Sequence, residues 1–192
     1  NTAVLLSGVN GFWNFLPVSN TFPTTTIIAG TYTGAVLFDY VNNKFVAGSS
    51  ISKFSESSRF IAIDQSENIW ISHPYHGIYK MTKDAAGAYK TKIYTNEKGL
   101  PSSLNNHLFK LNNQVLAATE KGVYSYNAAT DIFEPSAYYH KLLGNQSIRY
   151  LKNDASGNLW FIHEKTIAVV DFSYKQPKIF YLPELNNKML SG

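Results

Sequence analysis

Two closely spaced histidines, His73 and His76, are the residues of this chain whose spacing could suit a metal ion. They flank Pro74 and Tyr75 in a short polar segment between two apolar stretches. A zinc site needs three or four ligands, and no carboxylate adjoins this pair in the sequence. We therefore interpret both histidines as loop residues and predict no metal site.

Acidic residues recur at corresponding places rather than in pairs. Glu120 and Glu164 occupy equivalent positions, Asp64 and Asp154 stand in turn sequences, and Glu97 lies in a connecting segment. This pattern is typical of turns whose side chains bond their own backbone, rather than of two carboxylates placed for acid–base catalysis. No serine stands in a Gly-x-Ser-x-Gly sequence, and the chain has no cysteine, which excludes thiolate chemistry. We predict no catalytic residue and no cofactor.

Aromatic side chains offer a different chemistry, the stacking of a ligand ring. Trp70 and Trp160 stand within apolar stretches, which favours packing between layers over contact with a ligand. Trp13 and the Tyr138-Tyr139-His140 cluster lie near the ends of expected strands. For these residues both ligand contact and ordinary packing at the rim stay open.

The elements that would carry these residues repeat along the chain. Gly77 and Gly122 are 45 positions apart, and Trp70 and Trp160 are 90 apart. A fixed period of this length is typical of propellers and solenoids. Each period holds four short strand signals, and no helical periodicity extends over ten residues. The sequence therefore predicts an all-β fold, a β-propeller fragment of about four blades, each a four-stranded antiparallel sheet.

The repeat also predicts where each unit begins and ends within a single propeller segment. We expect an incomplete blade at 1–23, which includes a strand at 2–7, blades at about 24–58, 59–104, 105–146 and 147–187, and the start of another at 188–192. We expect inner strands near 59–63, 107–111 and 147–151. The register within 1–23 stays open, because Pro17 interrupts an apolar run.

Such an arc of blades would not be a complete propeller. It would leave apolar faces and unpaired strand edges at both ends. We therefore expect the chain to associate with itself or with the rest of its parent protein.

Composition narrows the classes of partner. Of the 192 residues, 16% are charged and 15% are aromatic, and the net charge is +4. No run of three basic residues occurs, so no nucleic-acid-binding stripe is visible. No apolar run approaches the roughly 20 residues that span a bilayer, so we predict no membrane contact by this segment.

Four stretches resemble the two-component regulator propeller repeat: 64–79, 98–101, 122–126 and 154–162. The resemblance covers about 24–190 and departs from the family pattern at Ser72, Leu116, Ala118 and His163. That repeat builds the periplasmic sensor region of hybrid two-component systems in Bacteroides-type bacteria. There, the propellers precede an immunoglobulin-like domain, a membrane helix and a histidine kinase. The resemblance thus implies a periplasmic location and a sensing role.

The resulting hypothesis is a non-catalytic ligand-sensing module, and the family resemblance implies carbohydrate breakdown products as ligands. The alternatives are a propeller enzyme, such as a lyase or hydrolase, and a scaffold that binds proteins. Loops held by a rigid scaffold commonly carry binding groups, which points to the loops at 73–76, 96–103 and 138–146. The ligand-binding candidates on them are His73, Tyr75, His76, Asn96, Glu97, Tyr138, Tyr139 and His140. Alanine at Tyr75, His76 and Tyr139 together is expected to weaken signalling without lowering the melting temperature.

Overall fold

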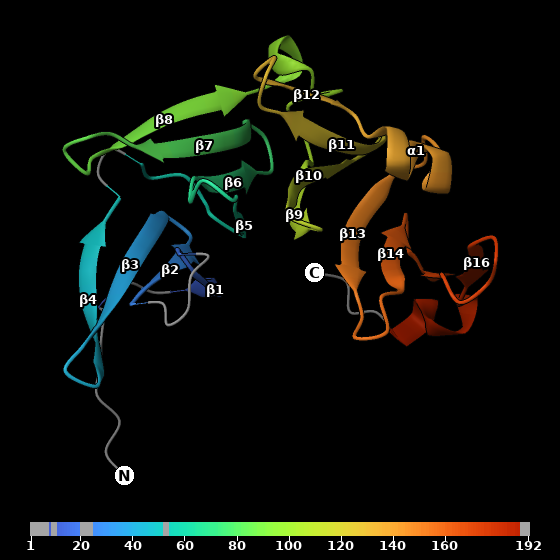
Figure 1. Cartoon of the computed structure of the whole chain (residues 1–192), viewed down its shortest axis with the longest axis horizontal. Coiled ribbons are helices and arrows are strands. Elements are labelled where there is room, and N and C mark those ends of the chain that lie inside the picture. Colours follow the sequence, from blue (N-terminus) through green and yellow to red (C-terminus); the bar gives the residue numbers. More distant parts are fainter. Residues whose placement is uncertain (1–7, 9–10, 20–24, 52–53, 189–192) are drawn as a thin grey trace.

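The fold is an open arc of four antiparallel four-stranded sheets, seen in a computed structural model that describes residues 8, 11–19, 25–51 and 54–188 (Figure 1). The predicted all-β propeller fragment is confirmed. The strand expected at 2–7 lies outside the described residues, and so does most of the blade start expected at 188–192. We number the sheets as blades 1 to 4 in chain order.

Each blade is built from four consecutive strands. Blade 1 comprises β1 (Phe12–Pro17), β2 (Thr26–Thr31), β3 (Gly34–Val41) and β4 (Lys44–Ser50). Blade 2 comprises β5 (Phe60–Ile63), β6 (Ile69–His73), β7 (Gly77–Lys83) and β8 (Tyr89–Tyr94). Blade 3 comprises β9 (His107–Leu111), β10 (Gln114–Thr119), β11 (Gly122–Asn127) and β12 (Ile132–Pro135). Blade 4 comprises β13 (Ile148–Asn153), β14 (Leu159–His163), β15 (Thr166–Asp171) and β16 (Lys178–Tyr181). The helical segments are η1 (Asn96–Lys98), α1 (Ala137–Leu143) and η2 (Pro183–Lys188).

The first strand of each blade lies on the concave side of the arc, and neighbouring first strands pack side by side (Figure 1). β5 lies between β1 and β9, and β9 in turn packs beside β13. The inner strands predicted near 59–63, 107–111 and 147–151 are therefore confirmed as β5, β9 and β13.

β1 differs from the expected division of the chain. The sequence predicts a separate unit at 1–23, whereas β1 pairs with β2 as the inner strand of blade 1. Its side chains alternate, so that Phe12, Asn14 and Leu16 are half-buried against the blade. Pro17 lacks an amide hydrogen and stands at the end of this edge strand, where a proline is tolerated.

The repeated aspartate turns join the first two strands of blades 2 and 4. The Asp64 carboxylate accepts hydrogen bonds from the amides of Ser66 and Asn68, both at 2.9 Å, and from Trp70 Nε1 at 2.8 Å. Asp154 binds Trp160 Nε1 in the same way, at 2.9 Å. The aspartates thus fix the turn and orient the tryptophan of the next strand, which confirms the predicted turn chemistry.

The repeated glycine after the second strand has a steric cause. Gly77 has a φ of 91°, and a Cβ there would come within 2.3 Å of the Tyr94 carbonyl oxygen. Gly34 has a φ of 125° and would meet the Phe54 carbonyl oxygen at 2.7 Å. A glycine is required because the left-handed turn passes directly against the backbone that leads to the next blade.

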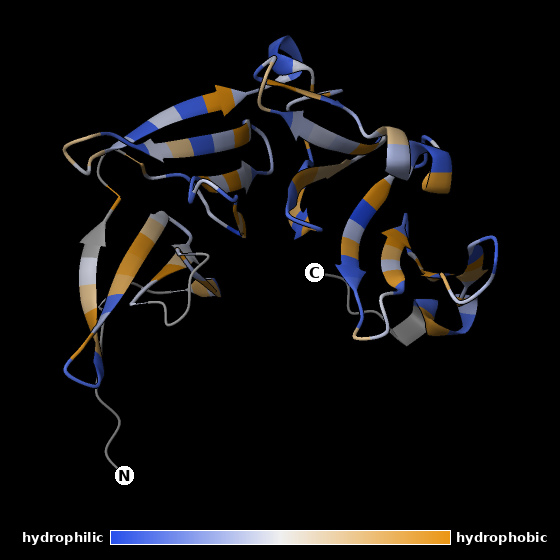
Figure 2. Ribbon diagram, in the orientation of Figure 1, coloured by the Kyte–Doolittle hydropathy of each residue, from blue (hydrophilic) through white to orange (hydrophobic). Residues whose placement is uncertain are grey.

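The hydrophobic core is divided into layers between blades. In β6, the Trp70 side chain packs toward blade 3, whereas Ile69 and Ile71 pack toward blade 1. This arrangement follows from the two-residue period of a strand buried on both faces. Figure 2 shows that residues at the β3–β4 hairpin tip and in η1 are hydrophilic, whereas those in β14 are mostly hydrophobic.

One predicted loop is a helix. The segment at 138–146 was expected to be irregular, but α1 forms there and ends at Gly144, whose φ is 70°. Tyr139 and Leu143 lie four residues apart on one face of α1 and pack with Ile148 in the core between blades 3 and 4. Seven residues form only two turns, too few to show a helical period in the sequence.

Candidate functional site

The residues predicted to bind a ligand fall into three separate groups. His73, Tyr75 and His76 stand in and beside the β6–β7 loop, and the His73 and His76 rings stack with centroids 4.2 Å apart. Asn96 and Glu97 lie exposed on η1, whereas Tyr138, Tyr139 and His140 belong to α1. Both helical segments lie over the outer part of the arc in Figure 1. The structure thus groups Tyr75 with the two histidines, whereas the candidates on η1 and α1 lie apart from them.

Tyr139 differs from its neighbours, because only 3% of its surface is exposed. Burial, together with the adjacent Tyr138, raises the pKa of its hydroxyl to about 12. Tyr138 and His140, on either side, are exposed. Alanine at Tyr139 would remove a core side chain, so the expected neutral effect of the triple alanine variant on melting temperature does not fit this structure.

A carboxylate that is distant in the sequence and is not among the predicted site residues approaches the histidine pair. Glu56, in the segment between β4 and β5, places its Oε2 3.3 Å from His73 Nε2 and 3.3 Å from His76 Nδ1. Burial and the nearby His76 hold the pKa of His73 below its usual value, while Glu56 acts in the opposite direction. Glu56 is 17 positions from His73, so only the folded chain makes them neighbours.

A groove with a volume of about 400 Å³ runs along the concave side of the arc. Its lining comes from the first strands of all four blades and is mostly apolar, including Leu16, Phe60 and Tyr150. Its polar lining residues include Asn14, whose buried Oδ1 accepts no hydrogen bond from the residues that the structure describes. The groove therefore offers a bound molecule a mainly apolar surface that is partly aromatic.

Two smaller hollows, of about 120 and 210 Å³, adjoin this groove where the inner strands begin. They share Asn105 and His107, and the first also shares Arg59 and Phe60 with the groove. We use the name channel mouth for five of their polar lining residues: Arg59, Asn105, His107, Glu120 and Arg149. Arg59 and Arg149 are the two arginines of the whole sequence, and both lie here.

His107 occupies the centre of the channel mouth. Its ring stacks on Phe60 with centroids 4.7 Å apart, and its Nδ1 lies 2.8 Å from the Arg149 carbonyl oxygen. Burial holds the pKa of His107 below 6.5, and the charges of Arg149 and Arg59 lower this pKa as well. The hydrogen bond to the Arg149 carbonyl oxygen has the opposite effect and raises it. A carbonyl oxygen only accepts, so the neutral ring donates from Nδ1 and leaves Nε2 as an acceptor.

This arrangement offers polar and aromatic groups to which a small polar ring could bind. The arginines offer forked donors, His107 offers an acceptor, and Phe60 and Tyr150 offer aromatic faces. Glu120 is the one carboxylate in the described lining of the three hollows, whereas glycoside hydrolysis uses a pair. None of the five channel-mouth residues is among the predicted binding residues, although a polar side chain at or next to the start of β5, β9 and β13 was a usable signal.

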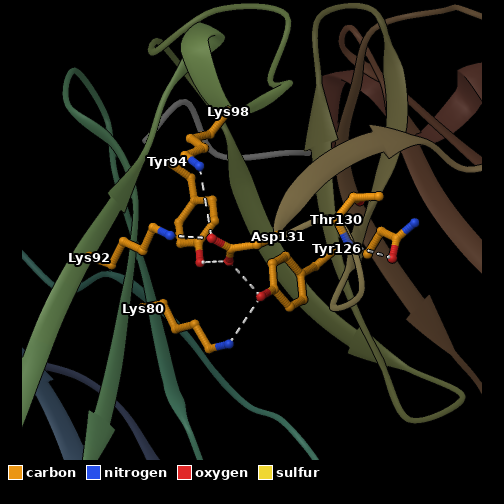
Figure 3. A network of polar contacts seen from close by, with 8 residues as sticks. Lys80, Lys92, Tyr94, Lys98, Tyr126, Thr130 and Asp131 are labelled. Atoms are coloured by element: carbon orange, nitrogen blue, oxygen red, sulfur yellow. Dashed lines mark hydrogen bonds and ion pairs between the residues drawn. The ribbon is translucent and has the colours of Figure 1, made fainter.

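A second polar cluster lies between blades 2 and 3 and is structural (Figure 3). Asp131 accepts hydrogen bonds from the hydroxyls of Tyr94, at 2.6 Å, and Tyr126, at 2.8 Å, and pairs with Lys92. The hydrogen bond from Lys92, then that from Tyr94, holds the pKa of Asp131 well below its usual range. Burial, and then the hydrogen bond to Asp131, raises the pKa of Tyr94. All of these groups are partnered within the protein, which leaves none poised for a ligand.

Comparison with known proteins identifies structural relatives. No protein-family model and no curated protein sequence matches the chain. The extracellular domain of a hybrid two-component system from Bacteroides thetaiotaomicron superposes with a TM-score of 0.62 at 21% identity, over 92% of this chain and 23% of that one. A second such domain from that bacterium gives 0.58 at 18% identity, over 87% and 21%. A 6-phosphogluconolactonase from Bacteroides fragilis gives 0.54 at 10% identity, over 88% and 55%.

The chain thus spans less than a quarter of the two sensor domains that it resembles. None of the helices within the described residues has the length and apolar character that crossing a membrane requires. At these identities the likeness concerns the fold. The chain has the β-propeller fold found in the extracellular domains of Bacteroides two-component sensor systems.

Proposed function

We propose that this chain is a non-catalytic, extracytoplasmic ligand-sensing module of a two-component sensor, located in the periplasm. The channel mouth carries this proposal, because it combines cationic donors and an acceptor beside the aromatic lining of the groove, on a fold shared with sensor domains. Binding there would contact the inner strands of several blades at once. Ligand binding could therefore reposition the blades relative to one another and to the rest of the sensor.

The proposed ligand is a carbohydrate breakdown product that carries a carboxylate. Sugar rings pack on aromatic faces, which Phe60 and Tyr150 supply, and carboxylates pair with the fork of an arginine. Arg59 and Arg149 outnumber the single acid Glu120 in the mouth, so an anionic sugar suits it better than a neutral one.

Glutamine at both arginines should weaken binding of such a ligand. We expect Arg59→Gln with Arg149→Gln to raise the dissociation constant for an acidic oligosaccharide by about tenfold or more, because two charge-assisted hydrogen bonds are lost. The measurement is isothermal titration calorimetry against a panel of neutral and uronate-containing oligosaccharides.

Lys152→Gln is the matched control, since it removes a cation from an exposed position on the same strand as Arg149. It should leave the affinity unchanged. If no acidic oligosaccharide binds the unaltered chain, or if the double variant binds as tightly as the unaltered chain, the proposed site is wrong.

An enzymatic role has weaker support. The likeness to a 6-phosphogluconolactonase concerns the fold at 10% identity. Among the described residues that line the groove and the two smaller hollows, Glu120 is the sole carboxylate and His107 is the sole histidine. His107 already uses one ring nitrogen to bind a backbone carbonyl.

We also propose that the arc associates with further copies or with the rest of the sensor protein. The two end blades expose large apolar side chains, among them Trp13 and Phe15 in blade 1 and Phe180 and Tyr181 in blade 4. Apolar surface of this kind marks interaction sites. Light scattering on the isolated chain should report a mass above 21.5 kDa. A stable monomer at micromolar concentration would contradict this expectation.

A further inference from the structure

Among the residues that the structure describes, Glu56, His73 and His76 form a group whose ligand atoms all lie within 4.8 Å of one another. We propose that these three side chains bind a divalent transition-metal ion, with Zn²⁺ as the best fit. Two imidazoles and one carboxylate are a donor set that zinc accepts, with a fourth position left to water. This inference does not rest on the proposed ligand-sensing function.

The distances between the ligand atoms suit zinc. A tetrahedral ion with bonds of about 2.0–2.2 Å separates its ligand atoms by about 3.3–3.5 Å. Glu56 Oε2 lies 3.3 Å from His73 Nε2 and 3.3 Å from His76 Nδ1, so two of the three edges already have this length. The third edge joins the two histidines, whose rings stack with centroids 4.2 Å apart and an angle of 14° between their planes. Because an ion lies in the plane of the imidazole that binds it, the half-exposed His76 side chain must rotate for both rings to bind the same ion.

The backbone around each ligand is held in place before any ion binds. His73 is the last residue of β6 and pairs with Gly77 across the hairpin. On the other side, Glu56 stands between two anchored residues, Phe54 and Ser58. Phe54 is buried with its ring 5.2 Å from that of Tyr79, and the Ser58 amide donates to the Thr31 carbonyl at 2.9 Å. Such preorganisation reduces the entropy lost on binding.

The three proposed ligand side chains are each partly exposed to solvent. The His73 side chain is 11% exposed, that of Glu56 33%, and that of His76 51%. An ion could therefore enter from solvent and keep a bound water. Coordination through His73 Nε2 moves the ring proton to Nδ1, which ends the 3.2 Å hydrogen bond from the Tyr75 amide. That amide belongs to an exposed loop, so water can replace the lost acceptor.

The ion would link the connection between blades 1 and 2 to the β6–β7 hairpin of blade 2. Glu56 lies in the connection from blade 1 to blade 2, whereas both histidines belong to the β6–β7 hairpin of blade 2. The same hairpin contributes Pro74 to the smaller of the two hollows at the channel mouth. The Pro74 carbonyl oxygen accepts a hydrogen bond from the Asn105 amide at 2.8 Å. Zinc would therefore fix a loop that borders the channel mouth.

The test uses the 192-residue chain without a histidine tag. After dialysis against Zn²⁺ and removal of the free ion, elemental analysis should find one zinc per chain. Zn²⁺ should also raise the melting temperature, because an ion that binds only the native state stabilises it, while Mg²⁺ should not. Replacement by Co²⁺ should give the intense visible absorption of a four-coordinate ion.

Two variants locate the ion. Glu56→Gln keeps the side-chain shape but removes the anionic ligand, and His76→Ala removes the most exposed ligand. Each should lower the zinc affinity by about tenfold or more, because even loss of a group behind a ligand costs about 10–100-fold. Glu184→Gln, an exposed carboxylate on η2, is the matched control and should bind zinc as the unaltered chain does.

Melting curves without metal establish that each variant is folded. The proposal would be overturned if the unaltered chain retained less than about one zinc ion per chain after the free ion is removed. So would a folded Glu56→Gln or His76→Ala variant that binds zinc with unchanged affinity, since the ion would then sit elsewhere. In either case the three side chains form a simple histidine–carboxylate cluster.

Discussion

Alanine in place of Trp70 should lower the free energy of unfolding by about 3–5 kcal/mol, the range for removal of a large aromatic side chain from a core. Trp70 is fully buried. Its ring centroid lies 5.4 Å from that of Tyr94 within blade 2, and 4.6 and 5.8 Å from those of Tyr126 and Phe133 in blade 3. Its indole also donates to Asp64. The variant would thus lose packing across a blade interface and leave a turn carboxylate without one of its donors.

Trp160→Ala is the matched control, because Trp160 occupies the corresponding place in blade 4 and donates to Asp154 in the same way. Trp160 is only half-buried, since Leu159 and Phe161 face blade 3 and leave it on the opposite face of the sheet. We expect a smaller loss of about 1–2 kcal/mol, in proportion to the area buried. Urea denaturation followed by circular dichroism measures both. If both variants lost the same free energy of unfolding, packing between blades 2 and 3 would not explain the loss in Trp70→Ala.

Removal of the Asp131 carboxylate should be the second most damaging change. In Asp131→Ala the fully buried Tyr94 hydroxyl loses its acceptor, and Tyr126 and Lys92 lose a partner as well (Figure 3). A buried polar group left without a partner costs about 1–3 kcal/mol. Because Asp131 is partly exposed, water can partly replace the carboxylate for Lys92. We therefore expect a loss of about 2 kcal/mol in the free energy of unfolding.

The same carboxylate should make stability depend on pH in acid. The hydrogen bonds from Lys92 and Tyr94 lower the pKa of Asp131 in the folded state below its ordinary value of 3.8. The unfolded chain therefore binds this proton first as the pH falls. The stabilisation is fully present above about pH 4 and is lost as the pH drops further toward the folded-state pKa.

Asp131→Asn should remove this part of the acid dependence, which urea denaturation between pH 2 and 6 would measure. Lys90→Met serves as the control. Lys90 lies on the same strand as Lys92 but is 4.0 Å from Asp84 and largely exposed, so its loss should change stability by less than about 0.5 kcal/mol. If Asp131→Asn unfolds with the same pH dependence as the unaltered chain, the network does not supply this stabilisation.

The repeat in the sequence determined the architecture because its signals are local. The aspartates at 64 and 154 bind amides two and four residues away, and Gly77 and Gly122 adopt left-handed backbone conformations. Strand alternation within β6 likewise fixes which side chains face each neighbouring blade. Four four-stranded sheets, the inner strands and the packing role of Trp70 were therefore predictable from the residues themselves.

The tertiary structure alone decided which polar side chains meet. Glu56 reaches His73 because the connection between two blades passes beside a hairpin, and Arg59 and Arg149 share the channel mouth because the inner strands converge. Tyr139 lies in the core because α1, too short to show a sequence period, packs on β11 and covers the interface between blades 3 and 4. These contacts join residues far apart in the chain, and their geometry depends on how whole blades pack rather than on any local pattern of residues.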